Sequence, residues 1–280
     1  MRKMLIALLL VTLPLAAAAE DCHFSASRII DIDAVGLKNL RANLGSTDLV
    51  LESAPGISKI EIRGTACASD AARLKDLQID GHRSGDDAIL DATNQGGYRN
   101  ISMFGATYAY LKLQVRVPAA LAVIVITGSG DVNASGLASL DYTAGSGDLT
   151  ADHIKGALTL TLGSSDVKAH HVGSVDLKKT GSGDVHISGV QGDVRSAQSG
   201  SGDLGFSDVG GNVSIGSSGS GNLALKQIGH NVDIGSTASG DVSADGVGGN
   251  FTVHSSNSGD VKHAHVKGKV SVPKHANDGR

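Results

Sequence analysis

A glycine-rich turn with the consensus Gly-Ser-Gly-Asp recurs through the second half of the chain and constrains its fold more than any other feature. Eight segments begin with this turn or a close variant, at residues 128, 145, 163, 181, 200, 219, 238 and 257. The spacing rises from 17 to 18 residues and then settles at 19. A repeat of about 20 residues is typical of a solenoid, in which each repeat forms one coil stacked on the next.

Within each repeat, apolar residues alternate with polar ones. The residue after the turn Asp is always aliphatic: Val132, Leu149, Val167, Val185, Leu204, Leu223, Val242 and Val261. Two positions later the residue is again apolar, except His263, and a further aliphatic column runs from Leu137 to Val266. A period of two indicates strands with one buried face, and the helical period of 3.6 is missing from these repeats.

One repeat cannot bury its apolar column alone, but stacked repeats form a continuous core whose backbones pair with the coils on either side. We therefore predict an all-β fold, a right-handed parallel β-helix (β-solenoid) of about eight 17–19-residue coils over residues 118–272. Residues 20–117 should form an irregular N-terminal β part that caps it, and residues 273–280 a tail. Weaker repeats at residues 45–64 and 83–92 suggest further coils, and residues 69–80 form the only plausible helix.

The first nineteen residues predict export from the cytoplasm. Arg2 and Lys3 precede an apolar run, and three small residues, Ala17 to Ala19, follow it. This is the pattern of a secretory signal peptide, which we expect to be cleaved near Ala19 to give a periplasmic or surface-secreted protein. No later run is long enough for a transmembrane anchor, which needs roughly 20 apolar residues.

Charge and cysteine content narrow the function classes further. Removing residues 1–19 takes away two of the 24 basic residues and none of the 28 acidic ones, which leaves a net charge of about −6. An acidic chain argues against a nucleic-acid partner, since phosphate binding needs a basic face. In an oxidising compartment the two cysteines, Cys22 and Cys67, predict a disulfide; two free buried thiols are the alternative.

Several of these features together resemble a known family. The recurring "GSGDV" units, the segment "LQVRVPAALAVIVITGSGDV" and the signal sequence are similar to those of the bacterial head-GIN-domain (auto-transporter adhesin) family and related envelope β-solenoid proteins. The resemblance covers residues 30–272, roughly. It implies a cell-envelope setting and brings no catalytic residues to this chain.

The acidic residue of the turn forms the longest regular column. Its members are Asp131, Asp148, Asp166, Asp184, Asp203, Asn222, Asp241 and Asp260. Stacked coils would place these side chains about 5 Å apart, so their charges need compensation. We expect turn capping, in which each oxygen accepts backbone N–H groups of its own or the next turn while glycine supplies unusual backbone angles. Calcium binding is the alternative, and Asn222 disfavours it because an amide is the poorer ligand.

The histidines and aromatic residues offer two weaker candidate sites. His153 and His171 are equivalent in successive repeats and are flanked by Asp152 and His170, so His153, His170 and His171 are weak candidates for a transition-metal site; polar bends that merely tolerate histidine are the alternative. Half of the eight Phe and Tyr residues gather in one segment: Tyr98, Phe104, Tyr108 and Tyr110. They either pack the wider N-terminal part or form an exposed binding loop.

Enzyme motifs are missing from the sequence. There is no Gly-x-Ser-x-Gly or His-Glu-x-x-His, and "GSGDLG" matches a dinucleotide fingerprint only by letter because a strand pattern follows it. We therefore expect a non-catalytic envelope protein without a cofactor that acts as a structural or adhesive binding surface. Its partner would be an envelope component, glycan or protein, and the alternative function is a polysaccharide-acting lyase or hydrolase of the β-helix type.

Overall fold

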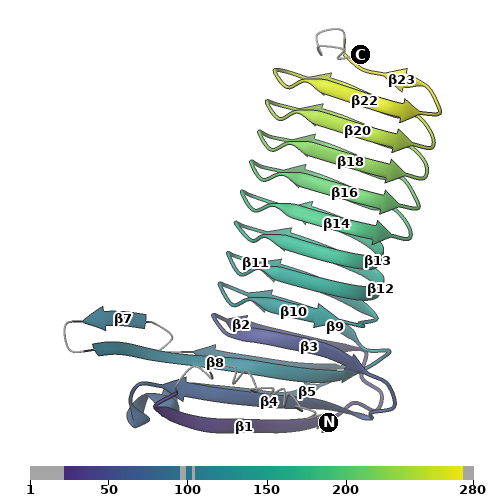
Figure 1. Ribbon diagram of the computed structural model, residues 1–280. Helices are drawn as coiled ribbons and strands as arrows, with labels where there is room; N and C mark the ends of the chain where they lie inside the picture. Colours follow the sequence, from purple (N-terminus) through teal and green to yellow (C-terminus); the bar gives the residue numbers. More distant parts are fainter. Residues whose placement is uncertain (1–21, 95–98, 103–104, 274–280) are drawn as a thin grey trace, which may run out of the picture.

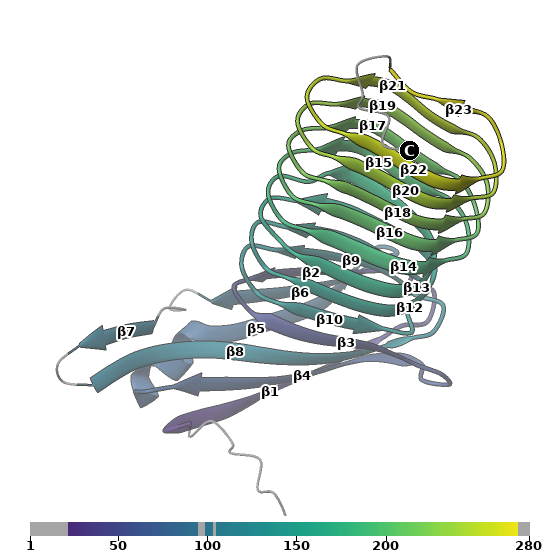
Figure 2. The ribbon, with the colours of Figure 1, turned by 45° about the horizontal axis from the view of Figure 1, so that its top comes forward.

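The structure, a computed structural model, describes residues 22–94, 99–102 and 105–273. The chain forms a rod of stacked strands that stands on a layer of longer strands (Figure 1). The first described strand lies at the base and the last one at the far end, and the turned view shows the coils following one another along the rod (Figure 2). The β-solenoid of about eight coils that the repeat predicts is confirmed.

The described residues contain one short 3₁₀ helix, and the rest of the regular structure is strand. The N-terminal elements are β1 (Phe24–Asp33), β2 (Asn39–Gly45), β3 (Asp48–Ala54), β4 (Lys59–Ala68), η1 (Ala71–Asp76), β5 (Leu77–Ser84), β6 (Asp87–Asn94), β7 (Arg99–Ser102), β8 (Gly105–Pro118) and β9 (Ala122–Thr127). The coils follow as β10 (Val132–Ser135), β11 (Ser139–Ala144), β12 (Leu149–Leu162), β13 (Val167–Lys179), β14 (Val185–Val190), β15 (Val194–Ser199), β16 (Leu204–Val209), β17 (Val213–Ser218), β18 (Leu223–Ile228), β19 (Val232–Thr237), β20 (Val242–Val247), β21 (Phe251–Ser256), β22 (Val261–Val266) and β23 (Val270–Ser271).

Each regular coil supplies one strand segment to each of two sheet faces. On the first face β14, β16, β18, β20 and β22 pair in parallel, and on the second β15, β17, β19, β21 and β23 do the same. The register joins equivalent residues, so Val185 pairs with Leu204 and Leu204 with Leu223. The predicted aliphatic columns are buried between the two faces, and only at the last coil do His263 and Val266 become partly exposed.

The N-terminal part continues both faces with strands of mixed direction. β3 lies in register under β10, β8 pairs in parallel with β3, and β4 and β1 follow antiparallel. On the other face β2 lies under β9, followed by β6 in parallel and β5 antiparallel. The parallel stack therefore begins at β6 and β8, and the antiparallel strands β5, β4 and β1 close its lower end.

Two local expectations for this part change. Residues 83–92 were expected to form a degenerate coil, but they belong to the β5–β6 hairpin, whose turn contains Gly85 with φ of 62°. Only the middle of the expected helix at residues 69–80 is helical. Asp70 caps the N-terminus of η1 by accepting a hydrogen bond from the Ala72 N–H, and β5 begins at Leu77 because an apolar side chain is buried there.

The glycines of the repeated turn avoid steric crowding between successive coils. The expectation that they supply unusual backbone angles is wrong for this turn. A Cβ on the second glycine of the turn would lie 1.9–2.1 Å from the carbonyl oxygen of the equivalent residue one coil earlier, as at Gly183, Gly202 and Gly221. At these glycines, coils in parallel register bring the backbones too close for a side chain. Thr47 and Ser165 occupy the position in two coils.

Left-handed backbone occurs instead at the corner of the first strand segment. The same position of all eight coils has positive φ, and we call this set the left-handed column: Gly136, His153, His171, Gly189, Asp208, Gln227, Gly246 and His265. The non-glycine members have φ of 52–56°. Glycine, aspartate and histidine enter this region more readily than β-branched residues, none of which occurs in the column.

A row of hydroxyl side chains, all buried except that of the half-buried Ser256, lies before the repeated turn. Its members end the second strand segment of their coils: Thr127, Thr180, Ser199, Ser218, Thr237 and Ser256. The hydroxyl of Thr127 donates to the Gly130 carbonyl over 3.1 Å, and that of Ser256 to the Gly259 carbonyl over 3.0 Å. In the coil with Ala144 at this position, the buried Tyr142 hydroxyl reaches the Gly147 carbonyl instead, over 2.7 Å.

Candidate functional site

The turn aspartates form a hydrogen-bonded ladder along one edge of the rod. Oδ1 of every member except the last, Asp260, accepts a hydrogen bond of 2.7–3.1 Å from the backbone N–H of the equivalent residue on the next coil. The ladder starts at Asp48, one coil before the residues that the sequence singled out. Asn222 takes the same role, since its Oδ1 accepts the Asp241 N–H over 3.0 Å. This geometry compensates the negative charges by peptide dipoles and gives the column an intercoil capping role.

The spacing of the carboxylates in the ladder disfavours calcium binding. In the part of the chain that the structure describes, one group brings three or more His, Cys, Asp or Glu ligand atoms within 4.8 Å of one another, and it contains no member of this column. The carboxylates of the ladder therefore do not converge as a calcium site of several oxygen ligands requires.

A second ladder on the opposite edge was missed by sequence reasoning. Its members are Asp193, Asn212, Asn231 and Asn250, and the Oδ1 of each accepts the backbone N–H one coil later over 2.8–3.2 Å, the last from Lys269. The hydrogen bond from the Asn212 backbone, followed by that from the Asn212 amide, lowers the pKa of Asp193. The signal was present as asparagine at a spacing of 19 residues.

The group of three ligands consists of Asp152, His153 and His171. Nδ1 of His153 lies 2.7 Å from Oδ2 of Asp152, and Nδ1 of His171 lies 3.1 Å from Oδ1 of the same carboxylate. The two imidazole rings stack with their centroids 4.5 Å apart. Hydrogen bonds from His171 and then His153 lower the pKa of Asp152, which keeps the carboxylate ionised.

His170, the third histidine that the sequence grouped here, does not join this cluster. Its Nδ1 lies 2.6 Å from the hydroxyl of Ser188 on the next coil. The register explains the difference. Asp152 pairs with His170 in adjacent strands, so both side chains leave the same outer face, and His171 reaches back to Asp152 only because its backbone is left-handed.

A shallow depression lies further along the first face, where small residues replace larger ones. The residues that line it include Gly205 and Ala224 together with His170, His186 and Lys226. The His186 ring covers Gly205, because a Cβ built there would lie 2.9 Å from Cδ2 of His186. The depression offers imidazole and ammonium groups on an open sheet face.

The aromatic segment is described only in part. Tyr98 and Phe104 lie outside the described residues. Tyr108 and Tyr110 lie within β8 with their ring centroids 6.0 Å apart, and the Lys112 ammonium lies 5.3 Å from the centre of the Tyr110 ring. Both tyrosines are half-buried. Whether they line a binding loop stays a prediction.

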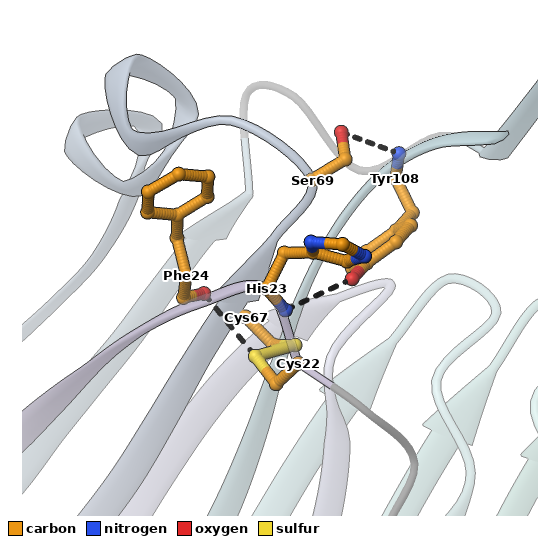
Figure 3. The surroundings of a disulfide bond; sticks show 6 residues. All are labelled: Cys22, His23, Phe24, Cys67, Ser69 and Tyr108. Carbon is orange, nitrogen blue, oxygen red and sulfur yellow. Dashed lines mark hydrogen bonds between the residues drawn. A yellow bond between two sulfur atoms is a disulfide. The ribbon is translucent and has the colours of Figure 1, made fainter. Parts of the chain in front are cut away.

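A disulfide joins the start of β1 to β4 beside this aromatic pair. Cys22 and Cys67 are bonded, with their Cα atoms 5.7 Å apart (Figure 3). The Tyr108 hydroxyl accepts a hydrogen bond from the His23 backbone over 3.2 Å, and the Tyr108 N–H donates to the Ser69 hydroxyl over 3.2 Å. These contacts tie the first described residues to β4 and β8 at the base of the rod.

Solved structures of two bacterial proteins are similar to this chain at low identity. One is a "putative cell adhesion protein" from Clostridium sporogenes ATCC 15579, with 12% identity and a TM-score of 0.31, and the match covers 89% of this chain and 98% of that one. The other is a "putative adhesin" from Bacteroides fragilis NCTC 9343, with 14% identity and a TM-score of 0.36, covering 89% and 96%. No curated protein matches the chain.

A family model matches the chain across the N-terminal layer and the first coils. It is the Toastrack DUF4097 model, and it covers residues 58–217, more than half of the 280 residues. The match spans β4 to β17, that is, the antiparallel base and the first half of the regular stack. The likeness to head-GIN-domain proteins stays an expectation from the sequence, whereas the family match shows that the chain belongs to the Toastrack DUF4097 family.

Proposed function

We propose that this protein is an exported, non-catalytic β-solenoid of the bacterial cell envelope whose outer faces bind an envelope glycan or protein. One observation carries the proposal: strands in parallel register repeat the same outward positions on successive coils along both faces. Equivalent side chains thus recur about every 4.8 Å along the rod. Such an array can hold an extended polymer or a flat partner by many weak contacts that add up.

The ionisable groups support a role without catalysis. Active sites gather groups whose pKa values are shifted for a chemical task. Here the shifts have structural causes: the Arg41 hydrogen bond lowers the pKa of Asp87, the Asn212 backbone that of Asp193, and burial raises that of Tyr142.

Export rests on the sequence of residues 1–19 and on the cysteine pair. A disulfide of this kind persists in oxidising compartments such as the periplasm or cell surface, and Cys22 and Cys67 are bonded. Among the described residues, no helix has the length and apolar character to cross a membrane.

Co-sedimentation tests the binding function. The chain beginning at Glu20 is mixed with insoluble envelope fractions, either polysaccharide or membrane protein, and the bound share is measured against concentration. We expect saturable binding that Lys226→Ser weakens, because the depression loses its ammonium group. Ser207 occupies the equivalent position one coil earlier, so the variant should fold. Absence of saturable binding would refute the proposal, and release of new reducing ends from the polysaccharide would favour the enzyme instead.

Export is tested separately by fractionating bacteria that produce the full chain. We expect the protein in the periplasm or medium, with Glu20 or a nearby residue as its new N-terminus. An uncleaved protein that stays in the cytoplasm would contradict export.

A further inference from the structure

The cluster of Asp152, His153 and His171 lies where the backbone of two successive coils is left-handed. His153 follows Asp152 at the corner of β12, and His171 occupies the equivalent corner of β13, with φ of 56° and 55°. This backbone conformation is disfavoured for residues with a side chain. It turns both imidazoles toward one carboxylate, so the local fold and not side-chain flexibility brings the three groups together.

The neighbouring coils leave the cluster open on both sides. Gly136 precedes His153 in the left-handed column, and Gly189 follows His171. A Cβ on Gly189 would come within 3.6 Å of the His171 ring, so glycine there keeps the space beside the ring clear. No side chain of the column therefore covers the histidine pair from the coil before or after it.

The three ligand atoms have the spacing of an incomplete metal site. They lie within 4.8 Å of one another, and the Asp152 oxygens lie 2.7 and 3.1 Å from the two imidazole nitrogens. Tetrahedral zinc with bonds of about 2.0–2.2 Å separates its ligand atoms by about 3.3–3.6 Å. The side chains of His153, His171 and Asp152 are 65%, 64% and 49% exposed, so small rotations reach this spacing.

We propose that Asp152, His153 and His171 form a surface site for a divalent transition metal ion of the zinc class. Two imidazoles and one carboxylate supply three ligands, which is the donor set that suits zinc, and the fourth position remains open to water or to an outside ligand. The hard cation calcium prefers a larger set of oxygen ligands. The site is independent of the envelope-binding function and can exist without it.

The chain contains a natural comparison for this site. Asp245 and His265 repeat the relation of Asp152 to His171 across two later coils, with His265 Nδ1 2.6 Å from Asp245 Oδ1. In that pair the left-handed residue next to Asp245 is Gly246, where the metal site has His153. The pair therefore offers two ligands, and the difference from the proposed site is one imidazole.

The substitutions that test the site come from neighbouring coils, so they should fold. Glycine already stands in the left-handed column at Gly136 and Gly189, which makes His153→Gly and His171→Gly compatible with the backbone. Serine stands at the Asp152 position in the coils at Ser135 and Ser188. The matched control is His265→Gly, which removes one histidine from the same column outside the site. Circular dichroism and the melting temperature establish that each variant retains the parent fold.

Titration calorimetry with zinc chloride on protein without an affinity tag measures binding. We expect one zinc ion per chain at this site, with affinity lowered at least tenfold in His153→Gly, His171→Gly and Asp152→Ser. His265→Gly should stay within twofold of the parent. Visible absorption of bound Co²⁺ gives a second readout, since the intensity of a four-coordinate site should be lost in the same three variants. Equal zinc affinity in the parent and in folded His171→Gly, or a loss in His265→Gly alone, would overturn the assignment.

Discussion

The backbone N–H of Asp203 donates a hydrogen bond of 2.8 Å to Oδ1 of Asp184, the equivalent residue one coil earlier. The acidic residue of each turn thus caps the following coil, and the chain of such bonds runs the length of the rod. Nothing in this geometry requires a charge, because Asn222 fills the role with its amide oxygen. The column is therefore a set of hydrogen bonds between successive coils, and single substitutions can measure what each bond contributes to stability.

Substitution of Asp184 separates capping from ion binding. Asp184→Asn should leave the free energy of unfolding nearly unchanged, since the acceptor oxygen remains. Asp184→Ala should lower it by about 1 kcal/mol, because the Asp203 N–H loses its partner. Urea denaturation measures both. Millimolar calcium should not shift the melting temperature of the parent, and a rise of several degrees that a chelator reverses would contradict the capping role.

A methyl group on the second turn glycine should disrupt the stack. In Gly202→Ala the new Cβ would lie 2.0 Å from the Gly183 carbonyl oxygen, so the backbones of both turns must shift to relieve the contact. We expect a loss of several kcal/mol in unfolding free energy, at the upper end of single substitutions. Gly205→Ala is the control, since its Cβ meets only the His186 ring, which can rotate, and alanine occupies the equivalent position at Ala224. Equal stability of the two variants would exclude the steric explanation.

Tyr142 should make stability depend on alkaline pH. Burial, followed by the charges of Asp131 and Asp148, raises the pKa of its phenol in the folded chain. The unfolded chain releases this proton at a pH of about 10. The associated stability is therefore complete below that pH and is lost as the pH rises further.

The variant Tyr142→Phe isolates this contribution. At pH 8 it should be less stable by about 1 kcal/mol, because the Gly147 carbonyl loses its donor. Above pH 10 the difference from the parent should narrow, as only the parent has this phenol to ionise on unfolding. Urea denaturation at pH 8, 10 and 11 gives the comparison, and a constant difference at all three values would refute the raised pKa.

Removal of the disulfide should weaken the base of the rod. Cys22 and Cys67 are 45 residues apart, and the chain-entropy relation for a loop of that length gives about 4 kcal/mol of stabilisation. The double variant Cys22→Ser, Cys67→Ser should lose up to that amount in urea denaturation. Thiol labelling of the denatured, unreduced exported protein should detect no free thiol, and two labelled thiols per chain would show that the bond does not form in the cell.

The coils were predictable because their pattern repeats. Val185, Leu204 and Leu223 follow one another at the same phase of each repeat, and stacking in register is the arrangement that buries all of them at once. The position of the turn Asp column followed from the same periodicity. That each carboxylate reaches the next coil and not its own turn depends on backbone spacing, which the residue pattern leaves open.

The N-terminal layer could not be predicted in the same way. The alternation in β4 indicates a strand with one buried face, yet antiparallel pairing with β1 and β8 satisfies it as well as parallel stacking would. The hairpin at Gly85 resembled a repeat turn in its letters. Whether a strand there is parallel or antiparallel depends on which strand it pairs with. The alternation of apolar and polar residues does not determine that partner.

The sequence predicted part of the cluster of Asp152, His153 and His171. Equivalent spacing placed His153 and His171 near each other, but it grouped His170 with them on equal terms. The left-handed backbone separates the roles, since it directs His171 back to Asp152 while His170 meets Ser188. The column that imposes this backbone contains glycine, aspartate, glutamine and histidine, a mixture that resembles an ordinary surface position until its φ angles are known.

The identical register of the later coils makes the length of the rod an adjustable quantity. Residues 200–218 form one 19-residue unit, and both of its boundaries precede the same turn, so its removal would join Ser199 to Gly219 without disturbing the alignment of any column. Each such duplication or deletion of gene sequence would change the reach of the molecule by about 4.8 Å. The N-terminal base and the cluster of Asp152, His153 and His171 would stay unchanged. The length of the rod can therefore change only in steps of one whole coil.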